Sequence, residues 1–300
     1  MKTLPYHFSV QACTLLFGLS GIIGGEVTAG IMTVVLGRGL FAALALGLTM
    51  ALRGTVPWNI PRGEGLRLLL NGALLGIHWF CFFMGVRTGG VAIGTLGFAS
   101  FPAFVTLGEA LLLRERPTRA DLLTLLCITA GICVLGSGVT LSSGAGTGLM
   151  WALAAGLTHA AVVMFNRYIQ THASVLQSSW IQCVGCGLIA LPGGLAGFTA
   201  LSESDLILIT LLGIACTGLA YTLMTYGLKG LNARTVSFII ALEPVYAILM
   251  TWILFSEPPG LRTTSGALLI VGGILLPPFH GGKKRLPRRK RSLLMSIRKK

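Results

Sequence analysis

The sequence predicts an all-α, polytopic membrane protein with ten transmembrane helices, arranged as two inverted five-helix repeats. The first observation is compositional: 54% of the 300 residues are hydrophobic and only 11% are charged, with a mean hydropathy of +0.82. Soluble domains carry about 25% charged residues. The second observation is a series of long apolar runs, and the third is an internal repeat. This composition excludes a soluble enzyme, a collagen-like fibre and a disordered chain.

Ten apolar runs follow one another along the chain, and each is close to the ~20 residues that a helix needs to cross a bilayer. In order, they cover residues 8–25, 30–52, 66–86, 91–113, 120–140, 148–168, 176–197, 205–228, 233–255 and 263–280. The connections are short and rich in Pro, Gly or polar residues. The first run lacks the charged start and cleavage site of a signal peptide, so we expect it to be retained as the first helix.

Lys and Arg lie mostly on one side of the predicted membrane. An even number of spans puts both termini on that side, and in the loops only Arg87 and Arg262 fall on the other side. Cytoplasmic loops hold the excess of Lys and Arg, so we expect cytoplasmic termini. Residues 281–300 form a basic tail, which is solvated or binds anionic lipid headgroups. The net charge of +14 is therefore explained by topology, and we expect no nucleic-acid partner.

The sequence offers no pattern typical of catalysis, a metal or a cofactor. It lacks the GxxxxGK[ST] loop of ATP-binding proteins and the HExxH and GxSxG motifs of hydrolases. All seven cysteines lie in apolar runs, where they pack as small hydrophobic residues. We therefore expect a protein that is not an enzyme, with no metal, no cofactor and no disulfide framework.

The chain also aligns with itself at a constant offset, without a gap, from the third to the fifth run and from the eighth to the tenth. The matched pairs include Gly76 with Gly218, Trp79 with Tyr221, Pro102 with Pro244, and Glu115 with Glu257. A repeat with an odd number of spans inserts upside down the second time, and inverted repeats are typical of transporters. We expect one repeat over residues 1–140 and the other over residues 141–280.

The two matched segments resemble a known family. PAFVTLGEALLLRERPT at Pro102–Thr118 and PVYAILMTWILFSEPPG at Pro244–Gly260 are similar to the corresponding parts of the two EamA domains in the drug/metabolite transporter (DMT) superfamily. The resemblance implies a carrier of the bacterial inner membrane with a central cavity, which usually exports amino acids or other small metabolites, often in exchange for protons. The first run reads TLLFGLSGIIGG where many relatives carry a Trp before the Gly, so a substrate role of that Trp does not transfer.

Four ionisable residues lie deep in the predicted spans, where an ionisable group is a functional candidate by default. At ~1.5 Å per residue, Arg38, His78, His159 and Glu243 fall roughly 12–18 Å from the nearest helix end and share one layer. Glu243, next to Pro244, is the hypothesised proton-linked or amine-binding group. Arg38 suits a bidentate clamp on a carboxylate or phosphate. The alternative for both is a structural ion pair with each other, and for both histidines it is packing.

Further candidates are aromatic or polar residues in the middle of the spans. Trp79, Tyr221 and Tyr246 are expected as cavity walls, with core packing as the alternative. Gln182 is either a cavity residue or one half of a hydrogen bond between helices.

Other residues are expected to have a structural role. We expect Pro102, Pro244, Glu115 and Glu257 to set helix-end geometry. Glu109, near the end of its run, is expected to pair with Arg114 and Arg116.

These observations favour a secondary active transporter that exports a small metabolite such as an amino acid by alternating access, with proton coupling as a hypothesis. The alternatives are a lipid or lipid-linked sugar flippase of the same fold, or a passive channel, which needs a continuous polar lining. A nucleobase, a flavin or a cationic drug stays open as the substrate. We expect a monomer or a loose homodimer in the bilayer.

Overall fold

The computed structural model describes residues 3–56, 59–137, 144–169, 171–256 and 258–275, and every regular element in these ranges is a helix. The elements are α1 (Leu4–Glu26), α2 (Ile31–Leu52), α3 (Arg62–Gly89), α4 (Val91–Phe98), α5 (Phe101–Leu112), α6 (Arg119–Gly136), α7 (Ala145–Tyr168), α8 (Val175–Phe198), α9 (Glu203–Gly213), the π-helix η1 (Ile214–Leu219), α10 (Ala220–Gly230), α11 (Ala233–Ile240), α12 (Glu243–Phe255) and α13 (Leu261–Leu275). Glu257 and the predicted basic tail, residues 281–300, lie outside the described residues.

Eight helical segments of the described chain are long and apolar enough to cross a membrane. In this group α9, η1 and α10 form one segment, and α11 and α12 form another. Two shorter apolar helices, α5 and α13, complete the series. The segments follow the predicted apolar runs in order, as expected for a multi-pass membrane protein.

The fourth and ninth predicted runs are not single helices, and the sequence prediction was wrong in this respect. α4 and α5 are separated at residues 99–100, and α11 and α12 at residues 241–242. Each downstream helix has a proline in its first turn, Pro102 in α5 and Pro244 in α12. Proline is favourable there, whereas within a continuous helix its ring would clash with the preceding turn. The two breaks occupy positions that the sequence repeat aligns.

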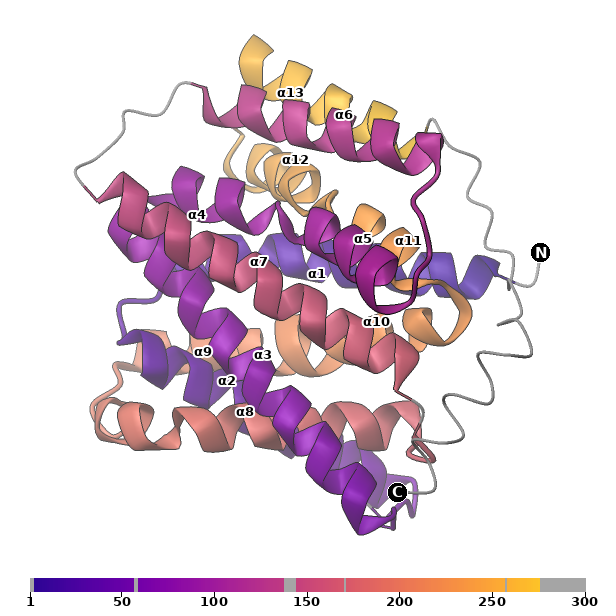
Figure 1. Ribbon diagram of the computed structural model, residues 1–300. Coiled ribbons are helices and arrows are strands. Elements are labelled where there is room, and N and C mark those ends of the chain that lie inside the picture. Colours follow the sequence, from indigo (N-terminus) through magenta and orange to yellow (C-terminus); the bar gives the residue numbers. More distant parts are fainter. Residues whose placement is uncertain (1–2, 57–58, 138–143, 170, 257, 276–300) are drawn as a thin grey trace.

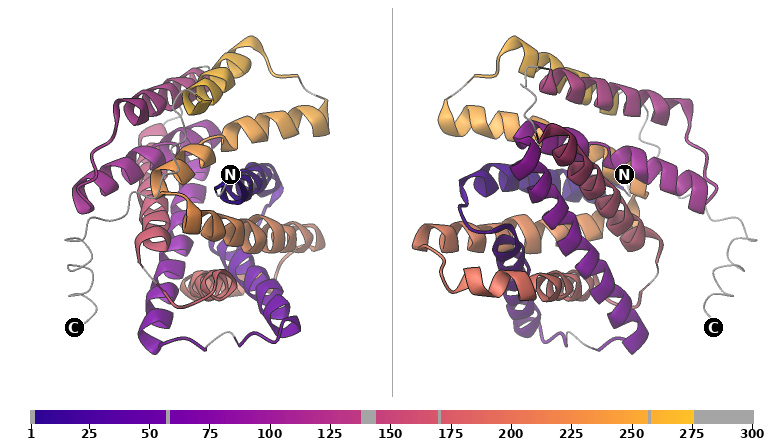
Figure 2. Two further views of the ribbon diagram at one scale, coloured as in Figure 1. Left: turned by 90° about the vertical axis from the view of Figure 1, so that its right-hand side faces the viewer. Right: turned by 60° about the vertical axis from the view of Figure 1, so that its left-hand side comes forward.

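The helices pack in extensive pairs (Figures 1 and 2). The largest contacts join α2 to α8, α3 to α7, α6 to α13 and α3 to α8, and α1 packs between α10 and α12. Glycines allow the closest approaches. A Cβ on Gly39 of α2 would lie 2.6 Å from the backbone nitrogen of Gly187 in α8, and one on Gly148 of α7 would lie 2.4 Å from the Cα of Gly89 in α3. Only hydrogen fits at such crossings, as is common between membrane helices.

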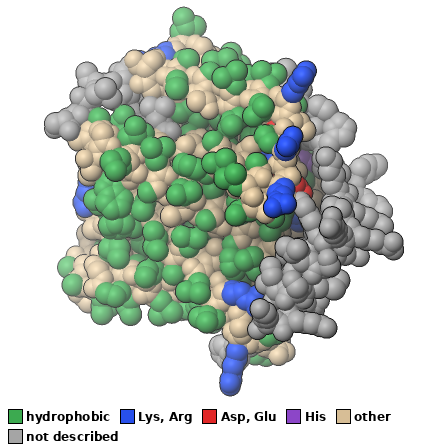
Figure 3. Space-filling model, in the orientation of Figure 1, with side chains coloured by type: hydrophobic (Ala, Val, Ile, Leu, Met, Phe, Trp, Pro, Cys, Tyr) green, Lys and Arg blue, Asp and Glu red, His purple; other side chains and the backbone are tan. Residues whose placement is uncertain are grey.

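The surface shown in Figure 3 is what a bilayer requires. Hydrophobic side chains cover most of this face, and Lys and Arg gather along the edge where the N-terminus lies in Figure 1. Exposed leucines lie along the helices, such as Leu44 and Leu48 in α2 and Leu126 in α6. A lipid environment makes such exposure favourable, and water would not.

Candidate functional site

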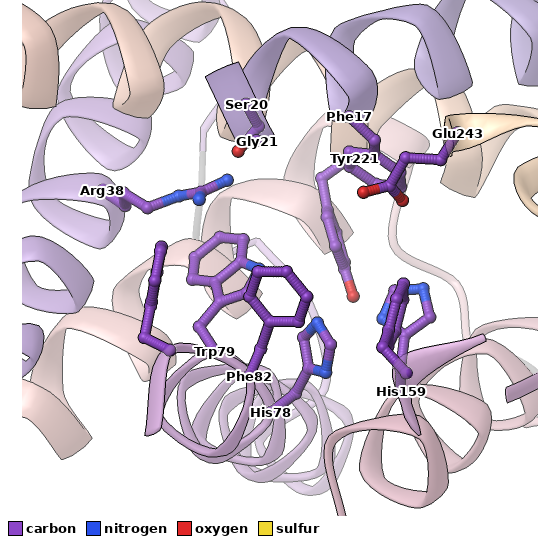
Figure 4. A pocket seen from close by; sticks show the side chains of 12 residues that line it. Phe17, Ser20, Gly21, Arg38, His78, Trp79, Phe82, His159, Tyr221 and Glu243 are labelled. Carbon is purple, nitrogen blue, oxygen red and sulfur yellow. The ribbon is translucent and has the colours of Figure 1, made fainter. Parts of the chain in front are cut away.

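A pocket in the middle of the fold brings together six of the eight residues that the sequence singled out as binding or coupling candidates (Figure 4). These are Arg38, His78, Trp79, His159, Tyr221 and Glu243. They come from α2, α3, α7, α10 and α12, so both halves of the chain contribute. The constant rise of a helix predicts that the four ionisable residues among them lie at one depth. The packing of the helices brings all six side chains into the same pocket.

Arg38 lies in the pocket with neutral partners. Arg38 is only 3% exposed. The Nε atom donates a hydrogen bond to Oγ1 of Thr217 over 3.0 Å, and Nη2 donates to the carbonyl oxygen of Cys216 over 3.3 Å. The guanidinium carbon lies 4.0 Å from the centroid of the Trp79 ring, which is a cation–π distance. None of these partners carries a negative charge.

Glu243 begins α12 directly after the helix break, and its carboxylate points into the pocket from the side opposite Arg38 (Figure 4). Among the described residues, the carboxylates that form ion pairs are those of Glu64, Glu109 and Asp121. Arg38 and Glu243 therefore face the same space without forming the structural ion pair that the sequence left open. The helix break positions the carboxylate, because it places Glu243 in the first turn of a new helix.

Two neighbouring imidazoles, tilted at 43° to each other, form the lower wall of the pocket in Figure 4. The rings of His78 and His159 have centroids 4.6 Å apart. The Nδ1 atom of His78 lies 2.9 Å from the carbonyl oxygen of Ala155, and because a carbonyl only accepts, Nδ1 must donate. His159 is 2% exposed, and neither of its ring nitrogens has a hydrogen-bond partner among the described residues. A buried polar group without a partner costs about 1–3 kcal/mol.

Tyr221 is a second buried group of this kind. Its side chain is fully buried, and its hydroxyl has no partner within the described chain. The ring meets Trp79 edge to face, with centroids 6.5 Å apart and an angle of 77°. These two residues were matched by the sequence repeat, and the fold places them opposite each other. Unpartnered hydroxyl and imidazole groups in one pocket are what a polar ligand needs for orientation.

The remaining two binding candidates lie outside the pocket. Gln182 joins a cluster of amides, where its Oε1 accepts from Nδ2 of Asn71 over 2.9 Å and from Nδ2 of Asn166 over 3.1 Å. This cluster connects α3, α7 and α8, in line with the alternative of a hydrogen bond between helices. Tyr246 donates its hydroxyl hydrogen to Oε1 of Gln11 over 2.7 Å and so links α12 to α1.

Sequence reasoning missed several residues of the pocket. The missed residues are Phe17, Ser20 and Gly21 of α1 and Phe98 of α4, whereas Phe82 and Phe83, which also line the pocket, continue the aromatic run that follows Trp79 in α3 and had pointed to a cavity face. Apolar residues have no distinguishing signal in a chain that is apolar nearly everywhere. The two partners of Arg38 were missed as well, because Thr217 and Cys216 resemble ordinary residues of a span. Within the part of the chain that is described, no group of three or more His, Cys, Asp or Glu could hold a metal ion.

A second buried cluster of charges lies away from the pocket. Arg234 in the first turn of α11 forms ion pairs with Glu109 of α5 and Asp121 of α6, each over 2.7 Å. Tyr168 of α7 donates to Oε1 of Glu109 over 2.6 Å. The sequence had assigned Glu109 to arginines a few residues downstream, and this was wrong. Chain packing brings Arg234 closer than those neighbours, and nothing in the spacing indicates it.

Of the residues expected to set helix ends, three are described. Pro102 and Pro244 do so at the two helix breaks. Glu115 lies in the loop after α5, where its backbone carbonyl accepts from Nη2 of Arg234 over 3.4 Å and its side chain forms no ion pair among the described residues. Glu257 lies outside the described residues.

Comparison with known proteins gives a consistent result. Residues 5–137 and 146–277 each match the EamA-like transporter family. The uncharacterized transporter YxxF of Bacillus subtilis (strain 168) is 26% identical over 270 residues, which are 87% of this chain and 86% of the relative. The putative permease-like protein YdzE of the same organism is 37% identical over 65 residues, or 22% of this chain and 83% of the relative. A solved crystal structure, 19% identical, has a TM-score of 0.71 over 91% of this chain and 94% of its own, which shows a shared fold.

Proposed function

Because the chain belongs to the EamA-like transporter family, we propose that it is a secondary active transporter that moves a small, carboxylate-bearing metabolite, such as an amino acid, by alternating access. Export is the proposed direction. The proposed location is the bacterial inner membrane, with both termini in the cytoplasm. The proposed substrate and coupling rest on the pocket, whereas the proposed direction rests on the resemblance to the family alone.

One observation carries the proposal. The pocket holds a buried cation, Arg38, and a carboxylate, Glu243, that face the same space from opposite sides without pairing. A zwitterion such as an amino acid would place its carboxylate at Arg38 and its ammonium at Glu243. The unpartnered nitrogens of His159 and the hydroxyl of Tyr221 would orient the rest of the molecule. A passive channel would instead need a continuous polar lining, whereas this polar group is central and walled by aromatic rings.

The architecture that we propose is ten spans in two inverted five-helix repeats, over residues 1–140 and 141–280. The two helix breaks at repeat-matched positions support it, because discontinuous helices near the bilayer midplane build the substrate sites of many transporters. The direct edge-to-face contact of the repeat-matched Trp79 and Tyr221 in the pocket supports it as well. The protein would work as a monomer or a loose homodimer, with its basic tail against anionic lipid.

Glu243 is the proposed coupling residue. It is the one acidic side chain among the residues that line the described pocket, so a proton gradient has no other carboxylate there to act through. An exchange of one proton for one substrate molecule would need this group to be free in one state of the cycle and occupied in the next. Its position in the first turn of α12, directly after the helix break, places it where the two helices α11 and α12 can change their relative orientation.

The test is counterflow in proteoliposomes with a panel of labelled amino acids, nucleobases and cationic drugs, with and without a pH gradient. We expect saturable exchange of a carboxylate-bearing compound that responds to the gradient. In Glu243→Gln, exchange should lose its response to the gradient while the purified protein keeps its melting temperature. Glu203→Gln is the matched control, since Glu203 is exposed at the start of α9 and distant from the pocket residues.

Three results would redirect the proposal. Flux that never saturates indicates a channel. Exchange that keeps its gradient response in Glu243→Gln removes the coupling role from that residue. Folded protein that exchanges no member of the panel argues against a small metabolite, and a lipid or lipid-linked sugar would then be tested by a scrambling assay.

A further inference from the structure

We propose that Thr217 is a positioning residue and that the π-helical stretch η1 holds Arg38 as an uncompensated cation for the carboxylate of a ligand. This rests on the proposed function in one respect only, namely that the pocket binds a carboxylate. The inference is carried by the geometry of η1, by the close packing of α2 against it and by the neutral character of both partners.

The hydroxyl of Thr217 has an unusual partner. Other threonines within the described helices, such as Thr14, Thr106 and Thr222, donate to the carbonyl four residues earlier. Thr217 instead donates to the carbonyl of Leu212, five residues earlier, over 2.9 Å. This is the spacing of a π-helix, and single π turns occur frequently at functional sites.

The direction of this hydrogen bond decides what Thr217 offers to Arg38. A hydroxyl has one hydrogen and two lone pairs. Since the hydrogen is used on Leu212, the oxygen can only accept from a neighbour, and Nε of Arg38 lies 3.0 Å from it. The carbonyl of Cys216, also within η1, accepts from Nη2 of the same guanidinium. The guanidinium of Arg38 therefore donates two hydrogen bonds to acceptors within one turn of η1.

Close backbone contact between α2 and the α9–η1 segment brings Arg38 next to its two acceptors. A Cβ on Gly213 would lie 3.3 Å from the carbonyl oxygen of Arg38 itself, and one on Gly37 would lie 2.2 Å from a methyl group of Ile209. The small residues let α2 lie directly against α9 and η1. Arg38 thereby reaches its two acceptors in η1 and is bonded to them rather than to Glu243 on the other side of the pocket.

The two hydrogen bonds leave the positive charge of Arg38 without a counter-ion. Thr217 and the Cys216 carbonyl are neutral, and the face of the guanidinium lies on Trp79. Nη1 forms no hydrogen bond within the described chain, and Figure 4 shows the guanidinium directed into the pocket. A permanent cation with fixed orientation and no counter-ion is complementary to a carboxylate. A neutral amide of the same shape cannot supply the negative charge.

The experiment compares benzoate with benzamide, which have the same shape but differ in charge, by calorimetric titration of the purified full-length protein in nanodiscs. A flat ring suits a pocket walled by aromatic residues. The wild type is expected to bind benzoate at least about 10-fold more tightly than benzamide, the range of a charge-assisted hydrogen bond. Thr217→Val, which keeps the shape, should reduce this ratio to less than about threefold.

Three variants separate positioning from general structure. Thr217→Ser keeps the hydroxyl and should keep the ratio. Thr222→Val removes a hydroxyl one turn further along the same segment and should keep it too. Arg38→Lys retains the charge but loses the Nε donor, so it should lose the ratio as Thr217→Val does, and it stands in for that variant if Thr217→Val does not fold.

The proposal is overturned by a wild type that does not distinguish the two probes, by a Thr217→Val protein that still does, or by equal loss in Thr222→Val. These outcomes are independent of transport. If counterflow detects no substrate while the benzoate ratio depends on Thr217, the positioning role stands and the transport proposal falls. If counterflow detects exchange while the benzoate ratio does not depend on Thr217, the transport proposal stands and the positioning role falls.

Discussion

Arg38 and Arg234 are both buried, at 3% and 8% exposure, but they have different partners. Arg234 forms ion pairs with Glu109 and Asp121, each over 2.7 Å. Arg38 contacts a hydroxyl, a carbonyl and an aromatic ring. A buried charge with a counter-ion stabilises the contact between helices, whereas a buried charge without one can still bind a charged ligand. The comparison therefore distinguishes the structural ion-pair cluster around Arg234 from the proposed binding pocket around Arg38.

The two regions are joined by a short, rigid element. Helix α11 runs from Ala233 to Ile240 and is buried over most of its length. Arg234 lies in its first turn, and Glu243 follows its end after the helix break. The ion pairs at Arg234 thus anchor the same segment that presents Glu243 to the pocket. A loss of these pairs would reach the pocket through α11, and also through α7, whose Tyr168 donates to Glu109 and which carries His159.

The largest expected effect is on stability, in the ion-paired region. Arg234→Gln leaves two carboxylates without their cation, and breaking a buried pair from one side costs about 3–5 kcal/mol. We expect a matching loss in the free energy of unfolding, measured by denaturant titration in detergent micelles. Arg116→Gln, at an exposed arginine outside the cluster, should change little. Equal losses in both variants would contradict the assigned role of the cluster.

The second expected effect is on ligand affinity in the pocket rather than on stability. Arg38→Gln removes a buried cation that has no counter-ion, but it also removes two hydrogen bonds to neutral acceptors, and these two effects on stability oppose each other. The melting temperature should therefore change much less than in Arg234→Gln, while the affinity for a carboxylate ligand should drop by about 100-fold. Calorimetric titration and a thermal scan of the same sample measure both quantities. A strong loss of stability together with intact binding would show that Arg38 is structural, as Arg234 is.

The third prediction sharpens the contrast between partnered and unpartnered groups. His159→Phe replaces two buried nitrogens without partners by carbon, and should raise stability by about 1–2 kcal/mol while weakening ligand binding. His78→Phe removes a made hydrogen bond to Ala155 and should lower stability. The two variants are compared by thermal unfolding. A loss of stability in His159→Phe would indicate that His159 has a partner after all, and a gain in His78→Phe would contradict the hydrogen bond to Ala155.

The smallest effect is expected for the tyrosines. Tyr246→Phe loses one hydrogen bond to Gln11, which costs about 0.5–1.5 kcal/mol, and should leave the transport KM unchanged because Tyr246 does not line the pocket. Tyr221→Phe loses a buried hydroxyl without a partner and should show the reverse pattern, with a small gain in stability and a raised KM. Counterflow kinetics with a melting curve distinguish the pair, and identical behaviour would argue against the placement of Tyr221.

The sequence determined the all-helical class, the order of the apolar segments and the depth of the buried ionisable residues. Hydrophobicity and the constant rise of a helix are local properties, so they can be read residue by residue. This is why Arg38, His78, His159 and Glu243 were placed in one layer, and why the family resemblance, which the match to residues 5–137 and 146–277 confirms, was visible in two short segments.

Only the tertiary structure decided which of these residues meet. The meeting of Glu243 with Arg38 in one pocket, the bonding of Arg38 to the π turn and the pairing of Arg234 with Glu109, 125 residues apart, all depend on contacts between helices that are distant in the chain. Depth along a helix follows from counting residues. The direction of a side chain around the helix, and the partner it finds there, follow from close packing against neighbours that the local sequence does not specify.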